Sequence, residues 1–121
     1  MEKYKEAMEQ GNPDAEFLLG VCYSEGLGVD IDEEKGKELF FESAQKGNAL
    51  AQRTIGYFYL SGEGFEKDDK EAVKWYRKSA SQGYSIAQND LSTCYYNGTG
   101  IKKNIKMAVK WLKKSAESGY F

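Results

Sequence analysis

The sequence of 121 residues contains no histidine. Histidine is the most frequent general base of enzymes and a common zinc ligand. Its absence excludes Ser-His and Cys-His catalytic pairs, and the two cysteines, Cys22 and Cys94, do not have the spacing of a metal site. We therefore predict a protein that is not an enzyme, with no catalytic residue, no metal and no cofactor.

Long apolar runs are also absent. No segment approaches the roughly 20 apolar residues that span a membrane. The first ten residues, MEKYKEAMEQ, are charged throughout and lack the apolar region of a signal peptide. We predict a cytoplasmic protein without a membrane partner.

The net charge of −2 gives no sign of nucleic-acid binding. The charges are nevertheless unevenly distributed along the chain. Residues 1–46 carry five basic and twelve acidic side chains, whereas residues 83–121 carry six basic and two acidic ones. The chain is therefore acidic at one end and basic at the other.

The sequence repeats with a period of 36 residues and no gap. The complete units are residues 11–46, 47–82 and 83–118, preceded by a half unit, 1–10, and followed by a stub, 119–121. Seven positions are identical in all three units: the first glycine, two alanines, a tyrosine, two loop glycines and a serine. We interpret the chain as one repeat domain.

Each unit is predicted to form two helices. Apolar residues recur at helical spacing, as in Ala15, Leu19 and Tyr23. Asn12, followed by Pro13, has the sequence of a helix N-terminus. Equivalent N-caps are expected for the second helices, at Asp32, Asp68 and Asn104.

A Gly-x-Gly pair recurs in each unit, beginning at Gly26, Gly62 and Gly98. Such a pair can form a phosphate-binding loop, but that loop follows a β-strand and is followed by a helix with Gly-Lys-Ser/Thr. Here the glycines separate two predicted helices. We therefore interpret them as helix–helix turns with one residue at positive φ.

The pattern of Ala15–Val29, Ala-x-x-x-Leu-Gly-x-x-Tyr-x-x-Gly-x-Gly-Val, is followed by Asp and, in the second unit, by Trp-Tyr-x-Lys-Ser-Ala. It resembles the Sel-1-like repeat, a relative of the tetratricopeptide repeats, over essentially the whole chain. The resemblance implies an all-α fold, a right-handed α/α superhelix (solenoid) of antiparallel helix pairs. It also implies a protein-interaction scaffold whose first helices line a concave groove.

One stripe of each first helix differs from unit to unit, as expected for a recognition surface. It mixes aromatic, arginine and amide side chains, and aromatic residues and arginine are enriched at interaction hot spots. The candidate groove residues are Phe17, Val21, Arg53, Tyr57, Leu60, Asn89, Thr93 and Tyr96. For Phe17 and Val21, packing against the next helix is the alternative.

Other recurrent residues are assigned to the core. The tyrosines Tyr23, Tyr59 and Tyr95 repeat, as do Trp75 and Trp111. Cys22 and Cys94 are two repeats apart, too far for a disulfide, so we predict buried free thiols. The lysines of the last helix could bind a polyanion or form a solvated helix face. They are Lys106, Lys110, Lys113 and Lys114.

We predict a module that binds a protein or peptide segment in its groove, with Arg53 facing a carboxylate or carbonyl. A structural spacer that uses its end faces is the alternative. The apolar end faces, which lack polar caps, also predict self-association. The opposite charges of the two ends favour a head-to-tail arrangement. In that interpretation the last helix leaves Trp111 and Leu112 partly exposed.

Overall fold

The computed structural model describes residues 11–118, in which six α-helices and no strand are present. The predicted half unit, 1–10, and the stub, 119–121, lie outside the described residues. Each helix has thirteen residues. The helices are α2 (Pro13–Glu25), α3 (Glu33–Gln45), α4 (Ala49–Ser61), α5 (Asp69–Ser81), α6 (Ser85–Asn97) and α7 (Ile105–Glu117).

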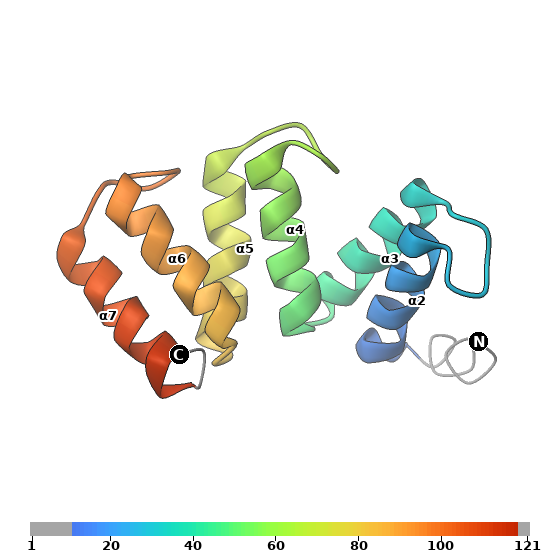
Figure 1. Ribbon diagram of the computed structural model, residues 1–121, viewed down its shortest axis with the longest axis horizontal. Helices are drawn as coiled ribbons and strands as arrows, with labels where there is room; N and C mark the ends of the chain where they lie inside the picture. Colours follow the sequence, from blue (N-terminus) through green and yellow to red (C-terminus); the bar gives the residue numbers. More distant parts are fainter. Residues whose placement is uncertain (1–10, 119–121) are drawn as a thin grey trace. The chain divides into compact units, whose positions relative to one another are not determined.

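The chain divides into two compact units between Gln52 and Arg53. In the first unit α2 packs against α3. In the second, α5 packs against α6 and α6 against α7, and successive helices run in opposite directions (Figure 1). The first turn of α4 belongs to the first unit and the rest of α4 to the second.

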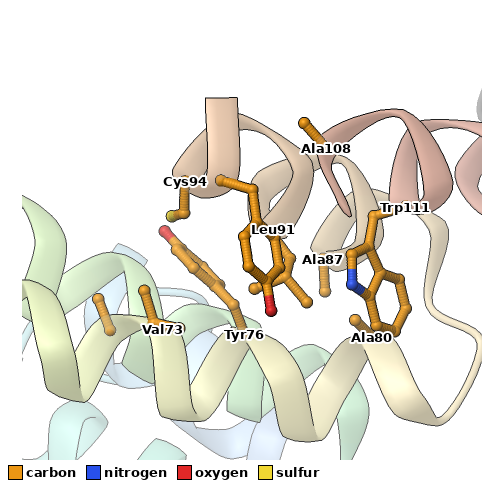
Figure 2. Close-up of a cluster of buried hydrophobic side chains, with 10 residues drawn as sticks. Val73, Tyr76, Ala80, Ala87, Leu91, Cys94, Ala108 and Trp111 are labelled. Atoms are coloured by element: carbon orange, nitrogen blue, oxygen red, sulfur yellow. The ribbon is translucent and has the colours of Figure 1, made fainter. Parts of the chain in front are cut away.

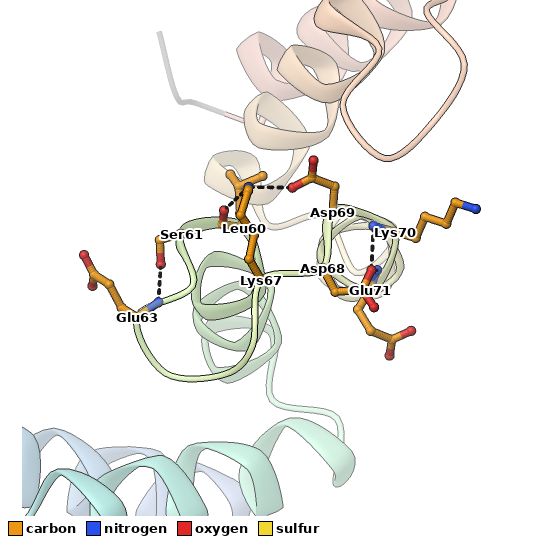
Figure 3. Close-up of polar contacts among 8 residues, drawn as sticks. All are labelled: Leu60, Ser61, Glu63, Lys67, Asp68, Asp69, Lys70 and Glu71. Carbon is orange, nitrogen blue, oxygen red and sulfur yellow. Dashed lines mark hydrogen bonds and ion pairs between the residues drawn. The ribbon is translucent and has the colours of Figure 1, made fainter.

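The predicted N-caps are confirmed. The side chain of Asn12 accepts hydrogen bonds from the backbone N–H of Asp14 (2.9 Å) and Ala15 (3.3 Å). Asp68 accepts from the N–H of Lys70 and Glu71, both at 3.1 Å (Figure 3). Asp32 and Asn104 cap their helices in the same way. These side chains satisfy N–H groups that a helix start leaves without a partner.

The Gly-x-Gly pairs form helix–helix turns, as predicted. Gly26 (φ +73°) and Gly98 (φ +72°) end α2 and α6 in the left-handed conformation, which glycine adopts without strain. In each turn, the carbonyl of the recurrent tyrosine accepts a hydrogen bond from the N–H of the next N-cap residue. The pairs are Asp32–Tyr23, Asp68–Tyr59 and Asn104–Tyr95, at 2.8–2.9 Å.

Two recurrent polar residues hold helices together by donating to backbone carbonyls. The hydroxyl of Ser43 donates to the carbonyl of Pro13 (2.6 Å), and that of Ser115 donates to the carbonyl of Ser85 (2.8 Å). Each joins the second helix of a repeat to the start of its first helix. This contact explains why serine is identical in all three units, because a buried hydroxyl needs a partner.

Successive repeats are joined by glutamine. Gln52 donates to the carbonyl of Ala44 and Gln88 to that of Ala80, both at 3.2 Å. In each case the first helix of one repeat thereby contacts the last turn of the preceding helix. The first repeat has Glu16 at this position.

Within each repeat, a small residue of the first helix faces a side chain of the second. A Cβ added at Gly20 or Gly56 would lie 2.8 Å from the ring of Phe40 or Tyr76. In the third repeat, Ser92 and Leu112 hold these two positions. Ser92 is buried and donates to the carbonyl of Ala108 (2.6 Å). Glycine is thus found where the opposing residue is aromatic.

The core predictions are largely confirmed, with three corrections. Trp75 and Tyr95 are buried, but Tyr23 and Tyr59 are only half-buried. Both cysteines are free thiols, as predicted, yet Cys22 is half-buried. Trp111 is 9% exposed rather than partly open, because it joins the buried cluster with Ala80 and Ala87 (Figure 2). Leu112 is 41% exposed.

Candidate functional site

The second unit contains a cleft of about 180 Å³ between helices that carry several of the predicted groove residues. Leu60 contributes from α4, Thr93 from α6 and Tyr76 from α5. The remaining lining residues belong to α6 and to the turn that follows it. They are Asp90, Cys94, Asn97 and Thr99.

An ion pair joins the two first helices at this site. The Nε–H of Arg53 on α4 donates to Oδ2 of Asp90 on α6 at 2.7 Å. Burial lowers the pKa of Arg53, but the hydrogen bond and the negative charge of Asp90 outweigh it and leave the pKa raised. Arg53 was predicted to meet a carboxylate of a partner, and here a carboxylate of the same chain accepts from it.

Arg53 retains the capacity for further contacts. A guanidinium carries five N–H donors, and the side chain of Arg53 is 34% exposed. Its guanidinium carbon also lies 5.6 Å from the centre of the Tyr57 ring, within cation–π range. The arginine is therefore fixed in position by Asp90 and Tyr57.

Two tyrosines of the predicted stripe present their rings to solvent. Tyr57 on α4 is 40% exposed and Tyr96 on α6 is 59% exposed. The ammonium of Lys103 lies 5.9 Å from the centre of the Tyr96 ring. Large exposed aromatic side chains beside a cleft are typical of recognition surfaces.

The polar members of the stripe on α6 differ in their surroundings. Asn89 is half-buried, and the hydroxyl of the exposed Thr93 donates to the Asn89 carbonyl at 3.1 Å. That bond orients the hydroxyl oxygen of Thr93, which can still accept. Thr93 and Leu60 are the two predicted residues that line the cleft itself.

Phe17 and Val21 belong to the first unit, and both are half-buried. The ring of Phe17 lies 5.4 Å from that of Phe40 on α3, centre to centre. This contact favours the packing interpretation for Phe17. The predicted stripe residues that the structure brings together are those of α4 and α6.

Sequence reasoning missed the residues that give the cleft its polar lining, above all Asp90 and Tyr76. One signal was available for Asp90. It follows Arg53 by 37 residues, one repeat plus one position, and this spacing places opposite charges on adjacent first helices. Tyr76 was not among the candidate groove residues; it belongs to the buried cluster, yet it also lines the cleft.

Two ionisable side chains that line the cleft, Tyr76 and Cys94, have raised pKa values. Burial raises the pKa of the Tyr76 hydroxyl, and the charge of Asp90 raises it further. Burial, followed by Asp90 and Asp69, raises the pKa of the Cys94 thiol to about 11. Both groups are neutral near pH 7, so Tyr76 can offer a hydrogen-bond donor and Cys94 only a weak one.

The cleft fits part of a ligand rather than a whole one. Small-molecule sites typically enclose about 300–1,000 Å³, and this cleft is smaller. Residues 11–118 contain no cluster of His, Cys, Asp or Glu that could hold a metal ion. No helix in the described part of the chain has the length and apolar character needed to cross a membrane. Its lining presents the hydroxyls of Tyr76 and Thr93, the amide of Asn97 and the carboxylate of Asp90.

Comparison with known proteins identifies the repeat. A family model described as the Sel1 repeat matches residues 13–48, 49–84 and 85–120. No curated protein matches the chain. The same comparisons bear out the predicted all-α repeat fold through similar solved structures.

Three of these structures are similar in both fold and sequence. A Sel1 repeat protein from Oxalobacter formigenes has a TM-score of 0.93 and 29% identity, covering 97% of this chain and 88% of that one. The antigen c5321 of uropathogenic Escherichia coli has a TM-score of 0.87 and 36% identity, over 96% of this chain and 25% of that one. Helicobacter pylori cysteine rich protein B has a TM-score of 0.75 and 26% identity, over 97% and 89%.

Proposed function

Because the chain belongs to the Sel1 repeat family, whose members are generally non-catalytic protein-interaction scaffolds, we propose that it binds a peptide segment of a partner protein across α4 and α6. One side chain of the peptide enters the cleft that Leu60 and Thr93 line. The flanking residues of the peptide lie on the exposed rings of Tyr57 and Tyr96.

The observation that carries this proposal is the juxtaposition of a small polar cleft with two exposed aromatic rings. Tyrosine supplies a large apolar contact area with few rotatable bonds, so its immobilisation costs little entropy. The cleft offers the hydroxyls of Tyr76 and Thr93, which favour a polar side chain in the peptide. In this proposal the side chain of Asn89 forms a hydrogen bond with the peptide main chain.

The ion pair between Arg53 and Asp90 has a positioning role in this proposal. It joins α4 to α6 on the side where the peptide binds, and so fixes the distance between Tyr57 and Thr93. Substitution of Arg53 therefore affects binding in two ways, by removing N–H donors and by leaving the Asp90 carboxylate, 20% exposed, without its partner.

The experiment is a selection from a random peptide library displayed on phage, followed by calorimetric titration of the selected peptides. Replacing both Tyr57 and Tyr96 by alanine should weaken binding by about 2 kcal/mol or more, as for aromatic hot spots. The control is Leu27→Ala, an exposed apolar residue of the first unit. Selected peptides that bind the Tyr57/Tyr96 double variant as tightly as they bind the Leu27→Ala control would contradict the proposal.

A further inference from the structure

The last helix carries an apolar stripe that is open to solvent. It consists of Ile105, Val109, Leu112 and Ala116, which recur at helical spacing along one face of α7. Val109 is 44% exposed and Leu112 is 41% exposed. An exposed row of aliphatic side chains on one helix face is typical of an interaction surface.

The same positions one repeat earlier show what such a stripe binds. The counterparts on α5 of Val109, Leu112 and Ala116 are Val73, Tyr76 and Ala80, each 36 residues earlier. Those three are 5%, 1% and 1% exposed. They are buried because α6 packs against α5 (Figure 2).

The covering helix has a simple pattern on its buried face. Ala87, Leu91 and Cys94 of α6 belong to the same buried cluster as Val73 and Tyr76. A small residue is thus followed by leucine four positions later and by a small apolar residue three positions after that. A helix with this pattern can pack on the stripe of α7 as α6 packs on α5, because α5 and α7 are equivalent helices of successive repeats.

The charge beside the stripe indicates the character of the partner. Lys106, Lys110 and Lys113 each follow a stripe residue by one position, so they form a basic row along its edge. They line a surface hollow of about 370 Å³ together with Val109, Lys114 and one acidic residue, Glu117, which follows Ala116. On α5 the counterpart of Lys113 is Arg77, whose guanidinium is 3.3 Å from the hydroxyl of Tyr95 on the covering helix.

We infer that the stripe on α7 binds an acidic amphipathic helix of a partner protein, in the position that α6 holds on α5. The apolar face of that helix has the pattern small–leucine–small and covers Val109 and Leu112. Its acidic side chains lie where Tyr95 lies on α6 and face Lys113 and Lys110. This surface is distinct from the cleft between α4 and α6, so a partner bound there leaves the peptide site open.

The experiment uses two synthetic peptides and the full chain. The first peptide has the sequence of residues 83–98 with Cys94 replaced by alanine, and a hydrocarbon staple on its solvent-facing side keeps it helical. The second also carries Tyr95→Glu. Binding is measured by nuclear magnetic resonance titration of the isotope-labelled chain, which detects millimolar affinity and reports the residues contacted.

Both peptides should shift the amide signals of α7, and the acidic peptide should bind several-fold more tightly at about 0.05 M salt than at about 0.5 M salt. Val109→Glu with Leu112→Glu should weaken binding about tenfold or more, since charges then face the apolar side of the peptide. Both residues are exposed, so the variant should fold. Leu27→Glu, at another exposed apolar site, is the control.

Three results would overturn the inference. In the first, neither peptide shifts α7 at millimolar concentration, or the α7 substitutions leave binding unchanged. In the second, the two peptides bind with equal affinity at low salt, which contradicts the preference for an acidic partner. In the third, sedimentation equilibrium finds a dimer that these substitutions abolish, and a second copy of the chain then covers the stripe.

Discussion

The first and third repeats of this chain form the same polar contact with different chemistry. In the first, the ammonium of Lys46 lies 2.9 Å from Oε1 of Glu16, whose side chain is 2% exposed. In the third, the counterparts are Ser118 and Gln88, and the Ser118 hydroxyl lies 3.1 Å from Oε1 of Gln88. The backbone geometry of the repeat therefore accommodates either an ion pair or a neutral hydrogen bond at this joint.

The ion pair and the neutral hydrogen bond differ in the neighbouring group that each buried side chain requires. A buried carboxylate needs a nearby cation, whereas a buried amide needs only a hydrogen bond. The first repeat also places Glu42, the counterpart of Lys114, where it hydrogen-bonds Glu16. The first repeat thus has two carboxyl groups at this joint, where the third repeat has Gln88 and Lys114.

The largest effect is expected when only one of the two contacting residues of the first repeat is replaced by its counterpart from the third repeat. Lys46→Ser leaves the Glu16 carboxylate without its cation, and we expect a loss of about 2–3 kcal/mol in the free energy of unfolding. Breaking a fully buried pair costs about 3–5 kcal/mol, and the partial exposure of Lys46 lowers that figure. The measurement is urea denaturation at pH 7.

The double variant Glu16→Gln/Lys46→Ser tests the comparison itself. It should recover most of the stability that Lys46→Ser loses, because Gln88 and Ser118 already form this joint in the third repeat. If the double variant is as unstable as the single one, the two joints are not equivalent.

A second exchange concerns the contact between the two helices of a repeat. Gly20→Ser places a Cβ against the ring of Phe40, where 2.8 Å separates them. We expect a loss of about 1–3 kcal/mol from this overpacking. Adding Phe40→Leu reproduces the Ser92–Leu112 pair of the third repeat. A double-mutant cycle in urea should give a favourable coupling of about 1 kcal/mol, and strict additivity would argue against this compensation.

A third prediction uses the turns that end the first helices. In Gly98→Val a β-branched residue must adopt φ +72°, so we expect a loss of about 1–3 kcal/mol. Gly62→Val should behave alike, since φ is +77° there. The control is Glu63→Val in the same turn as Gly62, where the native side chain is exposed. Equal melting temperatures for the Gly62 and Glu63 variants would contradict the turn assignment.

The smallest effect concerns pH. The hydrogen bond that the protonated Glu42 carboxyl donates to Glu16, followed by burial and the charge of Glu16, raises the pKa of Glu42 above its ordinary value of 4.5. The folded state therefore holds this proton more tightly than the unfolded state, and stability falls as pH rises from 4.5 through the raised pKa. Glu42→Gln should flatten that fall and stabilise the protein near pH 7 by a few tenths of a kcal/mol, because Glu42 is exposed.

Thermal unfolding from pH 4 to pH 8 measures this difference. Glu38→Gln, another exposed glutamate of α3, provides the matched control, and it should leave the slope unchanged. A wild-type slope that Glu42→Gln does not alter would assign the pH dependence to other groups.

Much of the fold could be predicted from the sequence because its determinants are local. Asn12, Asp68 and the turn glycines act within a few residues of their own position, so their types identify helix ends directly. The 36-residue period then determines the order of the helices. The contact between Ser43 and the carbonyl of Pro13 was not predicted, because a recurrent serine gives no sign of which distant carbonyl it meets.

The candidate site was less accessible to sequence reasoning. The variable stripe includes two residues that are exposed in the structure, Tyr57 and Tyr96, and variation between repeats argues against a shared packing role for them. The partner of Arg53 was missed because the 36-residue period pairs Arg53 with Asn89, whereas the contact is with Asp90, one position further along. Exposure of Trp111 was wrongly predicted, since the indole packs inward and leaves Leu112 outside.

The hydrogen bonds from Ser43, Ser115, Gln52 and Gln88 share one property, which is that the acceptor is always a backbone carbonyl. Every residue has such a carbonyl, so the donor does not depend on the side chains of its neighbour. At the two joints that Gln52 and Gln88 form between repeats, the adjacent repeat can therefore be exchanged without a compensating mutation, whereas the ion pair between Arg53 and Asp90 requires a side chain from each repeat. The glutamine joints leave the choice of adjacent repeat open to evolution, while the exposed positions of each copy are free to diverge.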